Sequence, residues 1–231
     1  MPLIFLHGSG LHAAFWDPLL AQVSRPDRGA LSFPGRKGQP GPSPSDVAGL
    51  ADAIGRLLPP NPVVVGHSLG GAVALELALT QPLAGLILIN TGARLRVMPG
   101  IMDAMREAVE SGIPAPVVGY SFQPETDPET VARTVAVEQE VPPESALADW
   151  QACMTFNRTA DLGRISVPTL VCGGGRDLLT PPKYSEALAA RIPGARLALL
   201  PEGGHMMPVE QVPWLVRQIE DFVAGLAAGK P

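Results

Sequence analysis

Val63-Val64-Val65-Gly66-His67-Ser68-Leu69-Gly70-Gly71 decides the fold of this 231-residue chain. The three consecutive valines predict a buried strand of a parallel sheet, and the small apolar residues at 72–79 predict a helix. Between them stands G-x-S-x-G, which places a serine on a turn so sharp that its neighbours two positions away crowd the strand and the helix. Gly66 and Gly70 relieve this crowding because they lack a Cβ atom. The stretch therefore predicts a strand, a tight turn at Ser68 and a helix.

The predicted turn gives Ser68 the position that a nucleophile needs. It lifts the serine Oγ clear of the sheet, and it leaves the Leu69 amide at the N-terminus of the helix, where a developing oxyanion can bind. A serine on a strand-to-helix turn can also be purely structural. The strand and helix predicted on both sides of G-x-S-x-G favour the catalytic interpretation.

Predicted strands and helices alternate along most of the chain. This order is typical of an α/β fold, with a mostly parallel sheet and helices on both faces. About six strands are expected, at residues 3–6, 30–33, 63–65, 86–89, 169–172 and 196–200. Helices are expected at 15–23, 72–79, 182–191 and 213–226. A further helix, ending near residue 58, is expected to begin at Ser43-Pro44-Ser45-Asp46, with Ser43 as its cap and Pro44 in its first position.

The alternation stops after the strand at 86–89 and resumes at 169–172. No strand is predicted between them. Helical segments separated by prolines are predicted instead, near 101–110, 116–122, 128–140 and 143–158. This pattern predicts a helical lid inserted over the carboxyl edge of the sheet. The expected division is a core at 1–91, a lid at 92–165 and the rest of the core at 166–231.

A serine nucleophile needs a base, and His205 is the best-placed histidine. Parallel strands all point the same way, so the loops that follow them share one edge of the sheet. His205 follows the strand predicted at 196–200 and can therefore face Ser68. Its alternative role is that of an exposed loop residue. The other histidines, at positions 7, 12 and 67, lie in the first loop and beside the serine.

The base needs an orienting carboxylate, for which Asp177 is the leading candidate. It follows the strand at 169–172 through three glycines that let the backbone bend inward. Asp177 can also cap the next helix, and both roles can coexist. Asp161 and Asp149 compete for the role but lie in the predicted lid, and Asn90, after the strand at 86–89, has no ionisable group.

The order Ser68, Asp177, His205, each at a strand end, resembles the α/β-hydrolase family over nearly the whole chain. Residues 7–10 (HGSG), 33–35 (FPG), 170–177, 180–181 and 204–205 also resemble loops of that family. The resemblance implies an oxyanion hole formed by the backbone N–H groups of Ser9 and Leu69, with Ser9 preferred over Gly10. Members of the family usually have two more strands before the strand that leads into the His-Gly pair, which here is the strand at 3–6 before His7-Gly8. The sheet here is therefore expected to be shorter, with 3–6 nearer an edge.

Together these features predict a serine hydrolase that cleaves carboxylic esters through an acyl-enzyme, with no metal or organic cofactor. Met98, Phe122, Trp150 and Met206 are apolar residues in or beside the predicted lid. If they line the site rather than the core, they suit a small to medium apolar acyl group. The alternatives are an enol-lactonase, a thioesterase or a carbon–carbon bond hydrolase of the same fold. A ligand-binding or receptor protein that keeps the triad is an alternative of another class.

The composition is that of a globular chain, with 46% hydrophobic residues, 17% charged residues and a net charge of −5. No basic run marks the sequence, so nucleic acid is not an expected partner. The apolar window at 70–89 is broken by polar residues and a proline, which fits helix, turn and strand better than a membrane span. Residues 1–6 lack the features of a signal peptide, and Cys153 and Cys172 lie outside any metal-binding pattern. A cytoplasmic monomer or homodimer acting on a small ester is expected.

Overall fold

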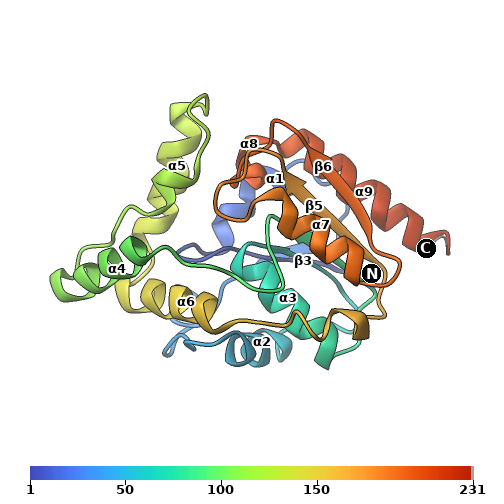
Figure 1. Cartoon of the computed structure of the whole chain (residues 1–231), viewed down its shortest axis with the longest axis horizontal. Coiled ribbons are helices and arrows are strands. Elements are labelled where there is room, and N and C mark those ends of the chain that lie inside the picture. The colour runs from blue at the N-terminus through green and yellow to red at the C-terminus, as the bar shows by residue number, and fades with distance from the viewer. Residues whose placement is uncertain (230–231) are drawn as a thin grey trace.

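A parallel sheet forms the centre of the computed structural model, which describes residues 1–229 (Figure 1). Within these residues six strands lie in the order β2-β1-β3-β4-β5-β6, and every neighbouring pair is parallel. The strands are β1 (Leu3–Leu6), β2 (Arg28–Leu31), β3 (Val63–His67), β4 (Gly85–Ile89), β5 (Thr169–Gly174) and β6 (Arg196–Leu200). The predicted α/β fold is confirmed. β2 forms one edge, so β1 lies one strand inside it.

Helices fill most of the connections between the strands. They are α1 (Asp17–Leu20), α2 (Val47–Gly55), α3 (Leu69–Thr80), α4 (Pro99–Ser111), α5 (Pro128–Gln139), α6 (Pro143–Thr155), α7 (Pro182–Arg191), α8 (Met207–Glu210) and α9 (Val212–Ala227). Short 3-10 turns occupy Ala13–Trp16, Val118–Ser121 and Leu162–Arg164.

Alternate residues of each strand supply the two cores on either side of the sheet. In β3, Val63 and Val65 join one core with α1 and α9, whereas Val64 joins the other with α2, α3 and α7. All three valines are fully buried. Each such side chain stabilises the fold by about 1.5–3 kcal/mol relative to its exposed state. The sheet is therefore held between two packed layers, which fixes the positions of its strand ends.

Three local predictions were displaced by contacts that the sequence pattern does not reveal. The helix predicted to begin at Ser43 begins at Val47, because Asp46 is extended and its carboxylate caps the helix by accepting the Gly49 N–H at 2.8 Å. The helix predicted at 15–23 is a 3-10 turn followed by the single turn of α1. The strand predicted at 30–33 ends at 31, because the Phe33 N–H donates to His7 Nε2 at 3.1 Å and leaves the ladder.

The helical segment between β4 and β5 leaves and rejoins the core at one place. An antiparallel bridge pairs Arg94 with Asn157, and the Arg158 N–H donates to the Ala93 carbonyl at 2.7 Å. The Arg158 guanidinium also binds both carboxylate oxygens of Glu76 on α3, at 2.6 and 2.7 Å. We call residues 92–165 the helical insertion. Among the described residues it contains no strand, and it covers the outer side of α3 with α6 (Figure 1).

Candidate active site

Ser68 occupies the turn between β3 and α3 with φ of 53° and ψ of −118°. A non-glycine residue adopts such angles rarely, at a cost on the order of 1–3 kcal/mol. The two motif glycines permit the turn, because a Cβ on Gly66 would overlap the Gly70 carbonyl and a Cβ on Gly70 would overlap the Leu6 carbonyl. The Thr91 hydroxyl donates to the Ser68 carbonyl at 2.7 Å and ties the turn to the end of β4.

The loop after β1 lies against this serine turn. A Cβ on Gly8 would come within 3.3 Å of the Ser68 Cβ, and Ser9 lines a cavity together with Ser68. His7 anchors the loop by donating from Nδ1 to the Gly8 carbonyl at 2.8 Å, while its Nε2 accepts the Phe33 N–H. The acceptor at Nε2 needs a neutral ring, and burial holds the pKa of His7 well below its usual value. The predicted oxyanion donors Ser9 and Leu69 thus both lie beside Ser68.

His205 and Asp177 form a hydrogen-bonded pair, with 2.9 Å between Nδ1 and Oδ2. The Thr180 hydroxyl donates to the same oxygen at 2.6 Å, and the Leu179 and Thr180 amides donate to Oδ1 at 2.8 Å each. Burial opposes ionisation of Asp177, but the charge of His205 and the hydrogen bonds outweigh it and hold its pKa below the usual value. The ionised carboxylate keeps the His205 proton on Nδ1, so Nε2 is the ring nitrogen left to act as a base.

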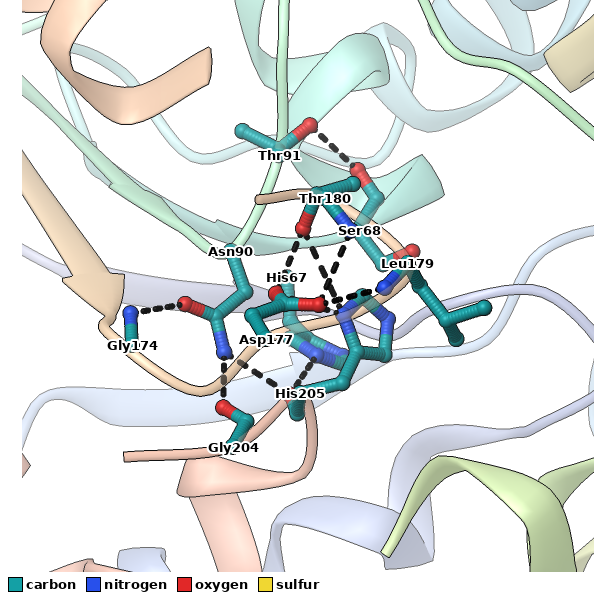
Figure 2. A network of polar contacts seen from close by, with 10 residues as sticks. All are labelled: His67, Ser68, Asn90, Thr91, Gly174, Asp177, Leu179, Thr180, Gly204 and His205. Atoms are coloured by element: carbon teal, nitrogen blue, oxygen red, sulfur yellow. Dashed lines mark hydrogen bonds and ion pairs between the residues drawn. The ribbon is translucent and has the colours of Figure 1, made fainter. Parts of the chain in front are cut away.

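Two further residues position His205 through its backbone (Figure 2). His67 Nε2 donates to the His205 carbonyl at 2.9 Å. Asn90 donates from Nδ2 to the Gly204 and His205 carbonyls at 2.6 and 2.9 Å, and its Oδ1 accepts the Gly174 N–H at 2.9 Å. Asn90 therefore joins the ends of β4 and β5 to the loop that carries His205. In the sequence Asn90 stands out only as a residue that cannot ionise, although its place at a strand end is a signal for this positioning role.

Asp149, a competitor for the triad acid, lies against the loop after β1 instead. Its Oδ2 accepts the Gly10 N–H at 2.9 Å and pairs with the Arg36 guanidinium. Arg36 in turn donates to the Leu11 carbonyl at 2.7 Å. Burial raises the pKa of Asp149 to about 6, and the Arg36 charge and the Gly10 amide limit the rise, so the carboxylate is ionised at neutral pH. This contact fastens α6 of the helical insertion to the loop after β1.

Two small cavities meet at Ser68 and His205. We call them the Val118 cavity, of about 20 Å³, and the Met98 cavity, of about 30 Å³, each after one of its lining residues. Ser68 and His205 line both, although within residues 1–229 no hydrogen bond joins the Ser68 hydroxyl to the His205 ring. In free enzymes such contacts are often long and tighten only with substrate.

The four predicted substrate residues take different places around these cavities. Trp150 lines both, Met206 lines the Val118 cavity, and Met98 lines the Met98 cavity with 57% of its surface exposed. Phe122 lines neither and packs, half-buried, against the core below α9. Three of the four therefore line a cavity that Ser68 also lines.

The comparisons with known proteins agree with this fold. Residues 3–218 match the model of the alpha/beta hydrolase family. The chain is 30% identical to a protein of Variovorax paradoxus, over 96% of this chain and 91% of the relative, whose provisional name is carbamate hydrolase RutD. It is also 30% identical to a pimeloyl-(acyl-carrier protein) methyl ester esterase of Aromatoleum aromaticum, over 96% and 98% of the two chains.

Among solved structures, a thermophilic esterase from Thermogutta terrifontis is 26% identical, with a TM-score of 0.83 over 98% of this chain and 90% of that one. The chain belongs to the alpha/beta hydrolase family. Over the described 229 residues, no helix has both the length and the apolar character that crossing a membrane requires.

Proposed function

We propose that the protein is a serine hydrolase that cleaves carboxylic esters. In this proposal Ser68 is the nucleophile, His205 the base and Asp177 the group that orients the base. The observation that carries it is the hydrogen-bonded His205–Asp177 pair, which lies beside both cavities with a serine on a strained turn. Relatives named as esterases support the same class of reaction.

The first half-reaction forms an acyl-enzyme. His205 Nε2 takes the proton of the Ser68 hydroxyl while Oγ bonds to the carbonyl carbon, and the π electrons move to the carbonyl oxygen. The Leu69 and Ser9 amides stabilise that oxyanion, a contribution of about 3–4 kcal/mol for each well-placed donor. When the oxyanion collapses, the C–O bond to the alcohol breaks and the alcohol leaves with the proton held on His205.

The second half-reaction returns the enzyme to its starting state. Water gives a proton to His205 and attacks the acyl carbon, and the carboxylic acid leaves as Ser68 regains its proton. Asp177 stays ionised throughout and stabilises the imidazolium in both halves. No other group is required to balance protons or electrons.

Substrate size is the second part of the proposal. The Val118 cavity is lined by apolar groups such as Val117, Val118, Trp150 and Met206, which suits a small or medium apolar group. Neither cavity exceeds the volume of about one water molecule. The helical insertion must therefore shift to admit an acyl chain, so we propose that it acts as a lid that selects the substrate.

Labelling with a fluorophosphonate, followed by peptide mass spectrometry, tests the proposed nucleophile. We expect one label, on the peptide that contains Ser68, and loss of both the label and p-nitrophenyl ester hydrolysis in Ser68→Ala. Ser121→Ala is the matched control, because Ser121 lines the Val118 cavity without lying on the strained turn. A Ser68→Ala protein that keeps wild-type turnover would refute the proposal.

A further inference from the structure

A pocket of about 250 Å³ opens where the chain enters the helical insertion. The segment at 93–96 forms one wall and α7 forms another. Four of the side chains that line it are basic, namely Arg94, Arg96, Lys183 and Arg191. We call it the basic pocket. These residues are spread over the sequence without forming a basic run, and the fold brings them together.

The four cations have no protein counter-charge. Among the described residues, none of them has a carboxylate oxygen within 4 Å. Of the acids on the adjoining segments, Glu76 and Asp161 are paired with other arginines, Arg158 and Arg164, and in the described part of the chain Glu186 on α7 forms no ion pair with any of the four cations. A concentration of unpaired positive charge in a chain with a net charge of −5 attracts small anions.

The arginines of the basic pocket stand on an anchored segment. Leu95, between them, is only 6% exposed and packs in the core that contains α3. On one side of it, Arg94 is bridged to Asn157, and the Ala93 carbonyl accepts the Arg158 N–H. The backbone that carries Arg94 and Arg96 is therefore fixed at the junction of core and insertion, as a binding site requires.

Arg96 connects the basic pocket with the reacting centre. It lines the basic pocket and also the Met98 cavity, whose other lining residues include Ser68 and His205. The Met98 cavity is bordered by apolar side chains, among them Val97 and Ile101. Arg96 therefore lies at the boundary between the cluster of cations and the cavity that Ser68 lines. The Val118 cavity, which Ser68 also lines, has no Arg or Lys among its lining residues within the part of the chain that the structure describes.

We infer that the substrate is an ester with an anionic group, a carboxylate or a phosphate, at the end remote from its scissile carbonyl. The basic pocket binds the anion, the Met98 cavity holds the connecting chain, and the Val118 cavity takes the small apolar side of the ester. Guanidinium groups match both anions because their planar donors bind two oxygens at once. The inference rests on the proposed function, since it takes Ser68 as the reacting residue.

Matched ester pairs test the inference. Each pair has the same chain length, from four to ten carbons, and differs only at its far end: a p-nitrophenyl ester of a fatty acid ends in methyl, and the p-nitrophenyl monoester of a dicarboxylic acid ends in carboxylate. We expect wild type to prefer the carboxylate end by about fivefold or more in kcat/KM at one chain length. The preference should shrink in high salt, because salt screens the attraction between charges with a screening length of about 10 Å at 0.1 M.

Charge-removing variants assign the preference to the pocket. Arg96→Gln and Lys183→Gln should each lower the ratio of kcat/KM for the carboxylate-ended ester to kcat/KM for the methyl-ended ester by about threefold, and the double variant should lower this ratio by about tenfold. Arg217→Gln is the control, because Arg217 is an exposed residue of α9 and its loss changes the net charge equally. If no chain length favours the carboxylate, or if Arg217→Gln has the same effect, the inference is wrong and ester hydrolysis by Ser68 still stands.

Calorimetry with inorganic phosphate at low salt distinguishes the two anions and does not depend on turnover. One phosphate bound per wild-type chain, and lost in the Arg96→Gln, Lys183→Gln double variant, supports the site and favours a phosphate-ended substrate. A carboxylate preference without phosphate binding supports the dicarboxylic class. Phosphate binding that persists in the double variant would refute the pocket as the anion site.

Discussion

Substituting Asp149 by Asn should destabilise the protein strongly, because it leaves the charge of Arg36 buried without a partner. The two side chains are 0% and 1% exposed. Removing one member of such a buried pair typically costs about 3–5 kcal/mol. For a domain of this size, about 2–4 °C of melting temperature corresponds to each kcal/mol, so we expect a loss of about 6–20 °C. Scanning calorimetry measures it directly.

Two companion variants separate the buried charge from other causes. Asp103→Asn breaks an exposed ion pair with Arg106 on α4 and should shift the melting temperature by no more than about 2 °C. Adding Arg36→Met to Asp149→Asn removes the orphaned charge and should restore at least half of the lost stability. If Asp149→Asn melts within about 2 °C of wild type, or the double variant is no more stable than the single one, the buried-charge argument fails.

Asp149 also positions the loop that carries the proposed oxyanion donor. In the Asp149→Asn variant the side-chain amide oxygen can still accept the Gly10 N–H, whereas Asp149→Ala offers no acceptor there. Asp149→Ala should therefore lower kcat by a further factor of about 10–100 at a temperature where both variants are folded, since loss of an oxyanion donor costs about 10²–10³. Equal kcat values for the two variants would contradict this role.

Three further predictions concern the triad, the lid and pH. Asp177→Asn should lower kcat by about 10⁴ because it favours the wrong His205 tautomer. Asp161→Asn alters only ion pairs with Arg158 and Arg164 and should leave kcat within about twofold of wild type. Steady-state kinetics of both variants decides which aspartate orients His205. Trp150→Ala should change the acyl-chain preference because Trp150 lines both cavities. Phe122→Ala should mainly lower the melting temperature, because Phe122 packs against the core. Unchanged selectivity in Trp150→Ala would count against the lid proposal. Burial raises the pKa of Glu138 from 4.5 to about 7, so the folded state holds this proton more tightly than the unfolded state. The free energy of unfolding therefore falls by up to about 3 kcal/mol as the pH rises from 4.5 to about 7. Glu138→Gln should therefore gain stability over wild type between about pH 5 and pH 8. Glu140→Gln, at an exposed position, should show no such gain. Parallel plots of stability against pH for wild type and Glu138→Gln would refute the argument.

The sheet was predictable because its information is local. Val63–Val65 and Leu197–Leu200 are short apolar runs bounded by turn residues, and pairing with neighbouring strands of the sheet agrees with their local preference. The element boundaries moved where a single side chain competed with the pattern. Asp46, and not Ser43, caps α2, and the Phe33 N–H donates to His7 Nε2 instead of pairing with a neighbouring strand.

The residues around the predicted triad were less accessible to sequence analysis, because their roles depend on distant parts of the chain. Asn90 acts on carbonyls more than a hundred residues away, and Arg36 meets Asp149 across a similar separation. No periodicity or motif encodes such pairs. The basic pocket likewise depends on distant parts of the chain, since its charges come from the segment at 93–96 and from α7.

The bridge between Arg94 and Asn157 makes the helical insertion an exchangeable part of the chain, because it holds the two ends of the insertion together. Because the two ends of the insertion meet, the entropic cost of closing that loop rises only slowly with its length, and segments of other sizes fit the same attachment points. Insertions are tolerated best where both ends lie together at the surface of a domain. Evolution or an engineer can therefore exchange the helices of the insertion while the serine turn and the His205 loop keep their own scaffold. A graft needs a carboxylate in the place of Asp149 to hold Gly10 and neutralise Arg36, and a cation in the place of Arg158 to pair with Glu76.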